Sequence, residues 1–107
     1  MAKKSVKCVF CGKETEFTLH ANFTVYCPKC KHMIHNECER GYGPVTPYFF
    51  LVGDDEIAKV DSIKNRYTLY LDGEEIPLKK TYYDAINEAG GILSGRFGFA
   101  ERRNNGE

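Results

Sequence analysis

Two pairs of cysteines constrain the fold of this 107-residue chain more than any other feature of its sequence. Cys8 and Cys11 form the first pair, Cys27 and Cys30 the second, and the pattern reads C-x2-C-x15-C-x2-C. Two thiolates three residues apart on a tight turn can occupy one side of a metal tetrahedron, and a second such turn completes it. We therefore predict one structural zinc ion bound by these four cysteines.

Two other uses of paired cysteines fit the sequence less well. A thioredoxin-like redox site needs one Cys-x-x-Cys in a βαβ pattern, whereas this chain has two pairs. A catalytic zinc keeps one coordination position open, whereas four thiolates close it. Two alternatives stay open: His32 replacing one cysteine ligand, and a second metal held by His20, His32, His35 and Cys38.

The residues around the cysteine pairs predict a β-hairpin followed by a short helix. Segments 16–20 (EFTLH) and 22–26 (NFTVY) alternate apolar and polar residues, as half-buried strands do. Segment 31–41 (KHMIHNECERG) places Ile34 and Cys38 four residues apart and ends in glycine, which is typical of a helix.

The stretch from Cys8 to about Gly41 resembles zinc ribbons and treble clefs, two families that place Cys-x-x-Cys knuckles around a β-hairpin. The expected helix after the second knuckle favours the treble clef. The resemblance implies a zinc-binding module, and it points to no particular function.

The second half of the chain predicts an antiparallel sheet with one helix. After the Gly- and Pro-rich segment 41–47, apolar and alternating runs predict strands over 47–52, 56–63, 65–71 and 74–78. Thr81 precedes a helical pattern that Gly90 and Gly91 should end, and a last short strand is expected over 96–100.

The Asp72-Gly73 pair predicts a two-residue hairpin turn within this sheet. Such a turn sets Leu69 opposite Ile76, so that the apolar faces of the two strands agree. Pro77 has no N–H to donate to a ladder, so the second strand should form an edge of the sheet.

These elements predict an α+β fold with two parts. The first is a treble-clef or zinc-ribbon module over 1–43, built from a β-hairpin and a short helix. The second is an antiparallel sheet with one helix over 44–103, followed by a disordered tail over 104–107.

Residues 54–86 resemble the LytTR family of bacterial DNA-binding domains. The shared features are an acidic turn before a strand, a strand-Asp-Gly-strand hairpin, and a helix after a Ser or Thr. The resemblance implies DNA binding, with Phe97 and Arg102 near the family's Phe and its DNA-contacting strand. The family's His-Arg-Ser pattern is replaced here by Ala-Glu-Arg-Arg-Asn.

Charge is distributed unevenly, although the chain as a whole is neutral. Up to Gly43 seven Lys and Arg stand against four Asp and Glu, and from Pro44 eight stand against eleven. Neutrality favours a protein partner, because phosphate binding needs a positive surface. The use of small zinc modules in transcription and translation favours nucleic acid, by analogy from the fold.

The main hypothesis is a non-enzymatic zinc-binding regulator that binds nucleic acid in transcription, because no nucleophile–base pair, catalytic carboxylate set or open metal site emerges. The alternative is a protein-interaction adaptor or inhibitor that docks through exposed tyrosines and a sheet edge. The expected contact residues are Lys13, Lys29, Lys31, Arg96, Arg102 and Arg103.

The sequence also sets expectations for location and ligands. The start of the chain lacks the apolar run of a signal peptide, and no stretch approaches the roughly 20 apolar residues of a membrane span. We therefore expect a cytoplasmic protein without a membrane partner. No small-molecule substrate is apparent from the residues.

Overall fold

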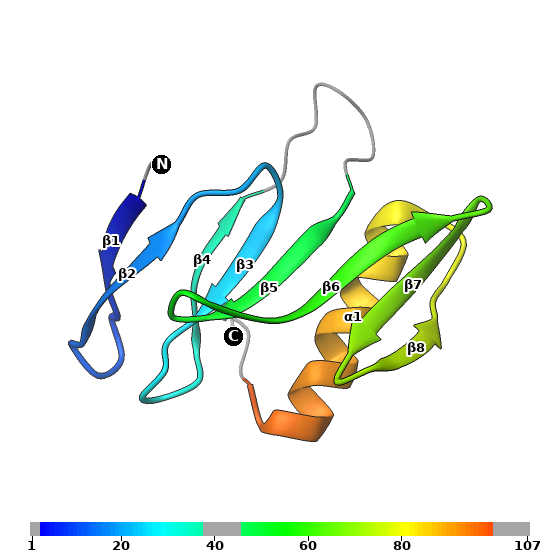
Figure 1. Cartoon of the computed structure of the whole chain (residues 1–107). Coiled ribbons are helices and arrows are strands. Elements are labelled where there is room, and N and C mark those ends of the chain that lie inside the picture. Colours follow the sequence, from blue (N-terminus) through cyan, green and yellow to red (C-terminus); the bar gives the residue numbers. More distant parts are fainter. Residues whose placement is uncertain (1–2, 38–45, 100–107) are drawn as a thin grey trace.

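The computed structural model of the chain describes residues 3–37 and 46–99 (Figure 1). Within these ranges it contains eight strands in two sheets and one helix. The strands are β1 (Lys3–Lys7), β2 (Glu14–Thr18), β3 (Phe23–Tyr26), β4 (Met33–Glu37), β5 (Tyr48–Val52), β6 (Asp55–Ile63), β7 (Arg66–Leu71) and β8 (Glu74–Pro77). The helix is α1 (Tyr82–Phe97).

The fold is mainly β, and the predicted α+β fold with a hairpin-plus-helix zinc module is wrong. Strand β4 stands where a helix was expected over 31–41, and it pairs antiparallel with β3. The helix prediction depended on only two positions, Ile34 and Cys38. Packing between distant residues favours the strand instead, because the ring of His35 in β4 lies 5.1 Å from the Phe17 ring and 5.2 Å from the Phe23 ring. Cys38, on the expected helix face, lies outside the described residues.

The predicted hairpin between the cysteine pairs is also wrong. Strand β2 pairs with β1 and β3 pairs with β4, so each Cys-x-x-Cys segment lies in the loop of its own hairpin. Asn22, expected in the turn, is fully buried just before β3. Its carbonyl accepts the N–H of Phe49 (3.1 Å) and its amide donates to the Tyr82 hydroxyl (2.6 Å). These bonds anchor the chain where it crosses from the small sheet to the large one.

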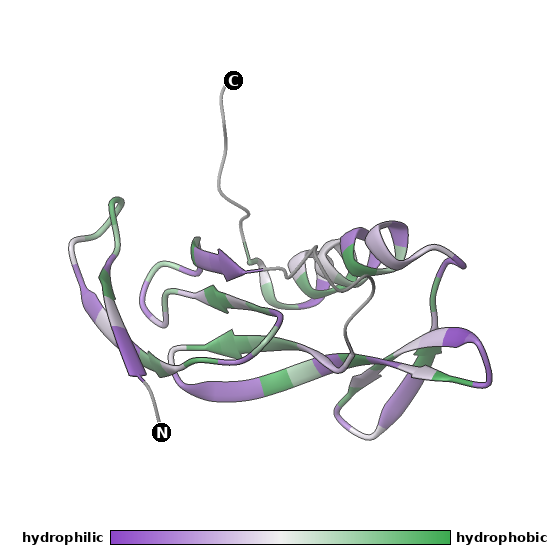
Figure 2. Cartoon of the chain, turned by 90° about the horizontal axis from the view of Figure 1, so that it is seen from above, coloured by the Kyte–Doolittle hydropathy of each residue, from purple (hydrophilic) through white to green (hydrophobic). Residues whose placement is uncertain are grey.

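The large sheet has the strand order β4-β3-β5-β6-β7-β8. Strands β3 and β5 are parallel, and the other neighbours are antiparallel. The domain boundary was predicted within residues 38–45, which lie outside the described residues. The large sheet takes strands from both sides of this segment. Figure 2 shows α1 on one face of this sheet, and the buried core between them includes Val60, Leu69 and Leu93.

Four of the five strands predicted for the second half, those over 47–52, 56–63, 65–71 and 74–78, are confirmed, because local turn signals decide them. Asp72 and Gly73 have φ values of 52° and 79°, which the two-residue hairpin turn requires. Leu69 lies opposite Ile76, as predicted. Strand β8, which contains Pro77, is the edge of the sheet.

Helix α1 begins after the N-cap Thr81, as predicted, but it does not stop at the two glycines at 90–91. Each glycine costs about 1 kcal/mol relative to alanine inside a helix. The buried residues Ala85, Ala89 and Leu93 recur every four residues, so one face of the helix packs on the sheet past the glycines. Tertiary packing therefore outweighs the local signal.

The helix ends at Gly98, whose φ of 73° is left-handed and whose N–H donates to the carbonyl oxygen of Ser94 (2.9 Å). Arg96 and Phe97 are its last helical residues, so the short strand expected over 96–100 is wrong. Residue 100 and the predicted tail at 104–107 lie outside the described residues. Within the described ranges, no helix has the length and apolar character needed to cross a membrane.

The turn between β5 and β6 ties the small β1–β2 sheet to the large sheet. Asp54 in this turn accepts the backbone N–H of Thr18 (2.8 Å) and the ammonium of Lys3 (3.0 Å). The Thr18 N–H and the Lys3 ammonium hold the pKa of Asp54 below its ordinary value. The preceding Gly53 packs near Pro28 of the second cysteine loop, where an added Cβ would lie 3.7 Å from Cγ.

Replacing Asp54 with Asn is expected to destabilise the chain at neutral pH and to have no effect in acid. A carboxylate whose pKa is lowered by folding stabilises the folded state above its unfolded pKa of about 3.9, and this contribution is lost as the pH falls through the folded pKa. The urea midpoints of wild type and Asp54→Asn, measured from about pH 7 to about pH 2.5, should therefore converge. Asp55→Asn, at the next exposed position, is the control, and a gap that is constant with pH would contradict the prediction.

Candidate metal centre

The four predicted cysteine ligands come together in space. All four Sγ atoms lie within 4.8 Å of one another, with Cys8 3.3 Å from Cys30 and Cys11 3.5 Å from Cys27. These distances exceed the roughly 2.05 Å of a disulfide bond. A tetrahedral zinc with Zn–S bonds of about 2.3 Å sets sulfur atoms roughly 3.8 Å apart. The cluster therefore fits a single metal ion that bridges the two loops.

The two cysteine loops have the same backbone design. Cys8 donates its N–H to the Lys13 carbonyl (2.9 Å), and Cys27 donates to the His32 carbonyl (2.8 Å). The N–H of Gly12 donates to the Cys8 carbonyl, and the N–H of Lys31, at the same position of the second loop, donates to the Cys27 carbonyl (2.9 Å in both). Gly12 (φ 80°) and Lys31 (φ 69°) hold this position, so glycine at 12 has the tight-turn role expected from the sequence.

Backbone N–H groups favour thiolates at the first cysteine of each loop. Burial raises the pKa of Cys8, but the N–H groups of Cys11 and Phe10 and the neighbouring thiols outweigh it and lower that pKa to about 6. Cys27 follows the same pattern, because the N–H groups of Cys30 and Lys29 outweigh burial and lower its pKa.

Cys30 shows the opposite shift. The His32 N–H lowers its pKa, but burial and the three neighbouring thiols together raise it to about 12. Four thiolates at this spacing repel one another, and a divalent cation among them removes the repulsion. The donors suit a soft or borderline metal such as zinc.

The three histidines lie outside this cluster. The His32 ring stacks on Phe10 (3.9 Å between centroids), and its Nδ1 lies 3.4 Å from the Cys30 sulfur. His35 contacts Glu37 (3.2 Å), and His20 packs on Phe49 (4.7 Å between centroids). Among the residues that the structure describes, the four cysteines are the one group placed to hold a metal ion. The proposed second metal set is not brought together there, and its Cys38 lies outside the described ranges.

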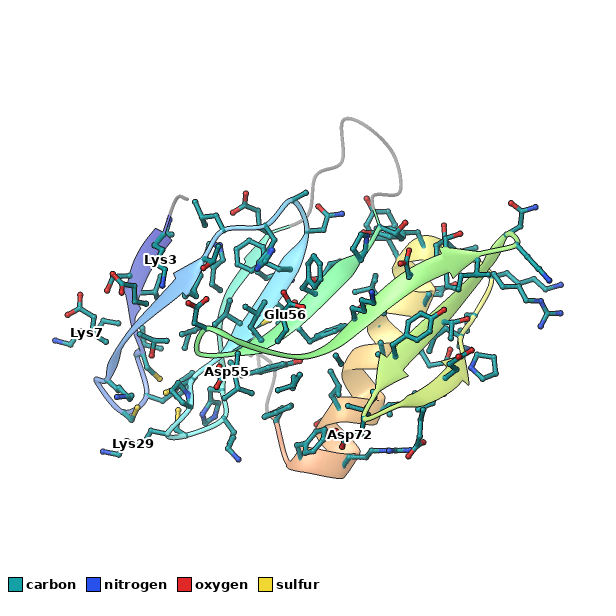
Figure 3. The ribbon with its side chains drawn as sticks, in the orientation of Figure 1. Lys3, Lys7, Lys29, Asp55, Glu56 and Asp72 are labelled. Atoms are coloured by element: carbon teal, nitrogen blue, oxygen red, sulfur yellow. The ribbon has the colours of Figure 1, made fainter. Side chains whose placement is uncertain are left out.

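The predicted contact lysines divide between two settings. Lys13 and Lys29 are exposed on the cysteine loops, and Figure 3 shows sulfur atoms gathered near Lys29. The Lys31 ammonium instead lies 5.7 Å from the centre of the Phe99 ring.

Of the predicted contact arginines, the structure describes only Arg96, and it pairs with Glu74 at the other end of the large sheet. The guanidinium of Arg96 donates to both carboxylate oxygens of Glu74 (3.0 and 3.2 Å). Arg102 and Arg103 lie outside the described residues.

The sequence analysis missed one group of basic residues. Lys64, Arg66, Lys79 and Lys80 line a cavity between the β6–β7 turn and the segment after β8. The sequence did contain a signal for this group, because the predicted Asp72-Gly73 hairpin sets the two basic segments beside each other. The sequence analysis did not use it.

Comparisons with protein-family models, with curated proteins and with solved structures found no match. The cysteine cluster supports a metal-binding module on its own geometry. The resemblances to zinc ribbons and to LytTR domains stay predictions.

Proposed function

We propose that this chain is a non-enzymatic zinc-binding protein that binds nucleic acid through its two cysteine loops. The cluster of four Sγ atoms within 4.8 Å is the observation on which the proposal depends. Zinc bound by four thiolates has no open position for a substrate, so its role is structural. Its effect is to hold the tips of the two loops side by side.

The loop tips expose a surface that suits nucleic acid. This knuckle surface consists of Val9, Phe10, Lys13, Pro28 and Lys29, which are all exposed. The Phe10 side chain is 51% exposed, and stacking on His32 fixes its ring. Exposed aromatic rings stack on unpaired bases, and lysines beside them neutralise phosphates. A single-stranded nucleic acid is therefore the proposed target.

A protein partner is the second candidate, and the exposure of Val9 at 84% favours it. Fewer tyrosines are exposed for such docking than the sequence led us to expect. Tyr48 and Tyr82 are buried, and Tyr83 is 49% exposed. Strand β8 offers the expected sheet edge. An adaptor would therefore use the apolar tip of the first loop rather than tyrosines.

Salt dependence tests the nucleic-acid proposal. The affinity of the zinc-loaded protein for a labelled single-stranded oligonucleotide should fall with salt, with a log–log slope of about −0.7 per phosphate neutralised. The double variant Lys13→Gln/Lys29→Gln should reduce this slope by about 1.4 and weaken binding. Fluorescence anisotropy titrations at several salt concentrations measure both quantities.

The control is Lys4→Gln/Lys59→Gln, which removes the same charge from β1 and β6 and should leave the slope unchanged. A slope that both double variants change equally would mean non-specific attraction. Absence of oligonucleotide binding by wild type would overturn the proposal and leave the protein partner as the candidate.

A further inference from the structure

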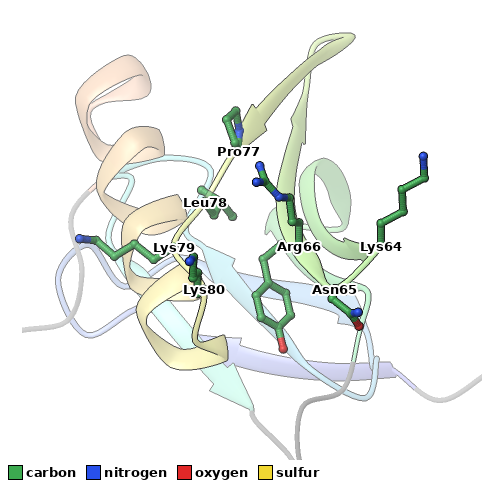
Figure 4. A pocket seen from close by; sticks show the side chains of 8 residues that line it. Lys64, Asn65, Arg66, Pro77, Leu78, Lys79 and Lys80 are labelled. Carbon is green, nitrogen blue, oxygen red and sulfur yellow. The ribbon is translucent and has the colours of Figure 1, made fainter.

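We infer that a basic cavity at the β7–β8 hairpin binds a phosphate-bearing ligand of nucleotide size. The cavity has a volume of about 410 Å³. Its lining comes from segments 64–67 and 77–80, which face each other across the hairpin (Figure 4). It lies away from the cysteine loops, at the far end of β6 and β7 (Figure 1). The inference therefore does not depend on the proposed function.

The lining concentrates positive charge in a chain that is neutral overall. Four of its eight residues are cations and none is an acid: Lys64, Asn65, Arg66, Tyr67, Pro77, Leu78, Lys79 and Lys80. The ion pairs found among the described residues use other cations, namely Lys3, His35 and Arg96. A concave surface lined by charges of one sign attracts a ligand of the opposite sign.

Backbone contacts hold both walls of the cavity in place. Lys64 and Asn65 have φ values of 52° and 65°, which fix a tight two-residue turn between β6 and β7. The N–H of Leu78 donates to the Tyr67 carbonyl (2.9 Å), and the N–H of Lys79 donates to a Glu88 carboxylate oxygen (2.9 Å). A ligand would therefore meet a preformed site rather than order two loose segments.

The cations differ in how they face the cavity. Figure 4 shows Arg66 facing the segment that holds Pro77 and Lys80, while the Lys64 and Lys79 side chains extend outward on opposite sides. We therefore assign Arg66 and Lys80 to the direct phosphate contacts. Arginine presents a planar fork that binds two phosphate oxygens at once, and lysine adds a compact charge.

The remaining lining residues explain the size and chemistry of the ligand. Tyr67, Pro77 and Leu78 supply an apolar wall beside the cations. A volume of about 410 Å³ lies within the range of small-molecule sites. Several cations next to an aromatic and aliphatic wall suit a phosphate joined to a flat, weakly polar group. A nucleotide has both parts, either free or within a nucleic-acid strand.

The test titrates the zinc-loaded full chain with inorganic phosphate, ATP and a 5′-phosphorylated oligonucleotide. ATP should bind saturably and more tightly than phosphate, and it should shift the amide NMR signals of residues 64–67 and 77–80. Arg66→Gln and Lys80→Gln should each weaken ATP binding about tenfold, as expected for the loss of a charge-assisted contact. Arg66→Lys should restore part of the affinity.

The control variants separate this cavity from the knuckle surface. Lys13→Gln/Lys29→Gln and Lys4→Gln should leave ATP affinity unchanged. If the oligonucleotide competes with ATP and binds more tightly, the phosphate comes from a nucleic-acid strand. If it does not compete, the ligand is a free nucleotide. Lack of saturable binding by ATP and oligonucleotide, or binding that Arg66→Gln and Lys80→Gln do not change, would overturn the inference.

Discussion

Removing zinc from the zinc-loaded protein with a chelator is expected to unfold both cysteine loops and the β1–β2 sheet. An isolated two-stranded sheet is marginally stable at best in water. Each strand of the β1–β2 sheet is five residues long, and the two cysteines of its loop form no disulfide. Structural zinc contributes an apparent binding free energy of about 10–16 kcal/mol in small zinc-dependent folds. Its removal therefore leaves too little stabilisation for this end of the chain.

Amide hydrogen exchange before and after chelation measures this effect locally. Protection should disappear over 3–18 and 27–32, because the β1–β2 sheet and the two cysteine loops lose their common anchor. Protection in β6, β7 and α1 should fall less, because their apolar core includes no cysteine. Unchanged protection over 3–18 and 27–32 in metal-free protein would contradict a structural role for the metal.

Single cysteine variants identify the ligands independently. Cys27→Ser is expected to abolish stoichiometric zinc, because it removes a buried member of the tetrad. Cys38→Ser is the matched control and should retain about one zinc per chain by metal analysis. Zinc loss in Cys38→Ser would instead make the fifth cysteine a ligand.

The cluster of four cysteines could be predicted from the sequence because each of its two pairs is a local signal. Each Cys-x-x-Cys pair specifies its own turn, and Gly12 supports the first. The three hairpin connections between β5 and β8 are also local, since tight turns such as Asp72-Gly73 fix the register of the strands beside them. Within each cysteine pair and within each turn, the decisive residues lie within a few positions of one another.

The pairing of strands in the first half could not be predicted in this way. Alternation in residues 16–26 correctly indicated two strands, but alternation does not say which strand each will pair with. The choice is set by Asn22, which bonds to Phe49 and Tyr82 far along the chain, and by the parallel pairing of β3 with β5. The helix through 90–91 and the basic cavity likewise depend on contacts between distant segments.

Phe17→Ala is expected to lower the free energy of unfolding by about 3–5 kcal/mol, the range for removing a buried phenylalanine ring. The Phe17 side chain is fully buried although it belongs to the small β1–β2 sheet. Its ring lies edge-on to Phe23 of the large sheet, with centroids 5.8 Å apart, and it shares a core cluster with Val25 and Leu51. The variant therefore removes a buried ring from the apolar contact between the two sheets and leaves a cavity.

The same variant tests whether the two sheets position the metal ligands together. Leu19→Ala, two residues further on at a side chain that is 38% exposed, is the control and should cost less than about 1 kcal/mol. Urea unfolding of the zinc-loaded proteins measures both values. Because β2 leads out of the first cysteine loop, loosening it should also speed zinc release to a competing chelator in Phe17→Ala and not in Leu19→Ala. Equal release rates, despite the loss of stability, would mean that the thiolates hold the loops together without help from the core behind them.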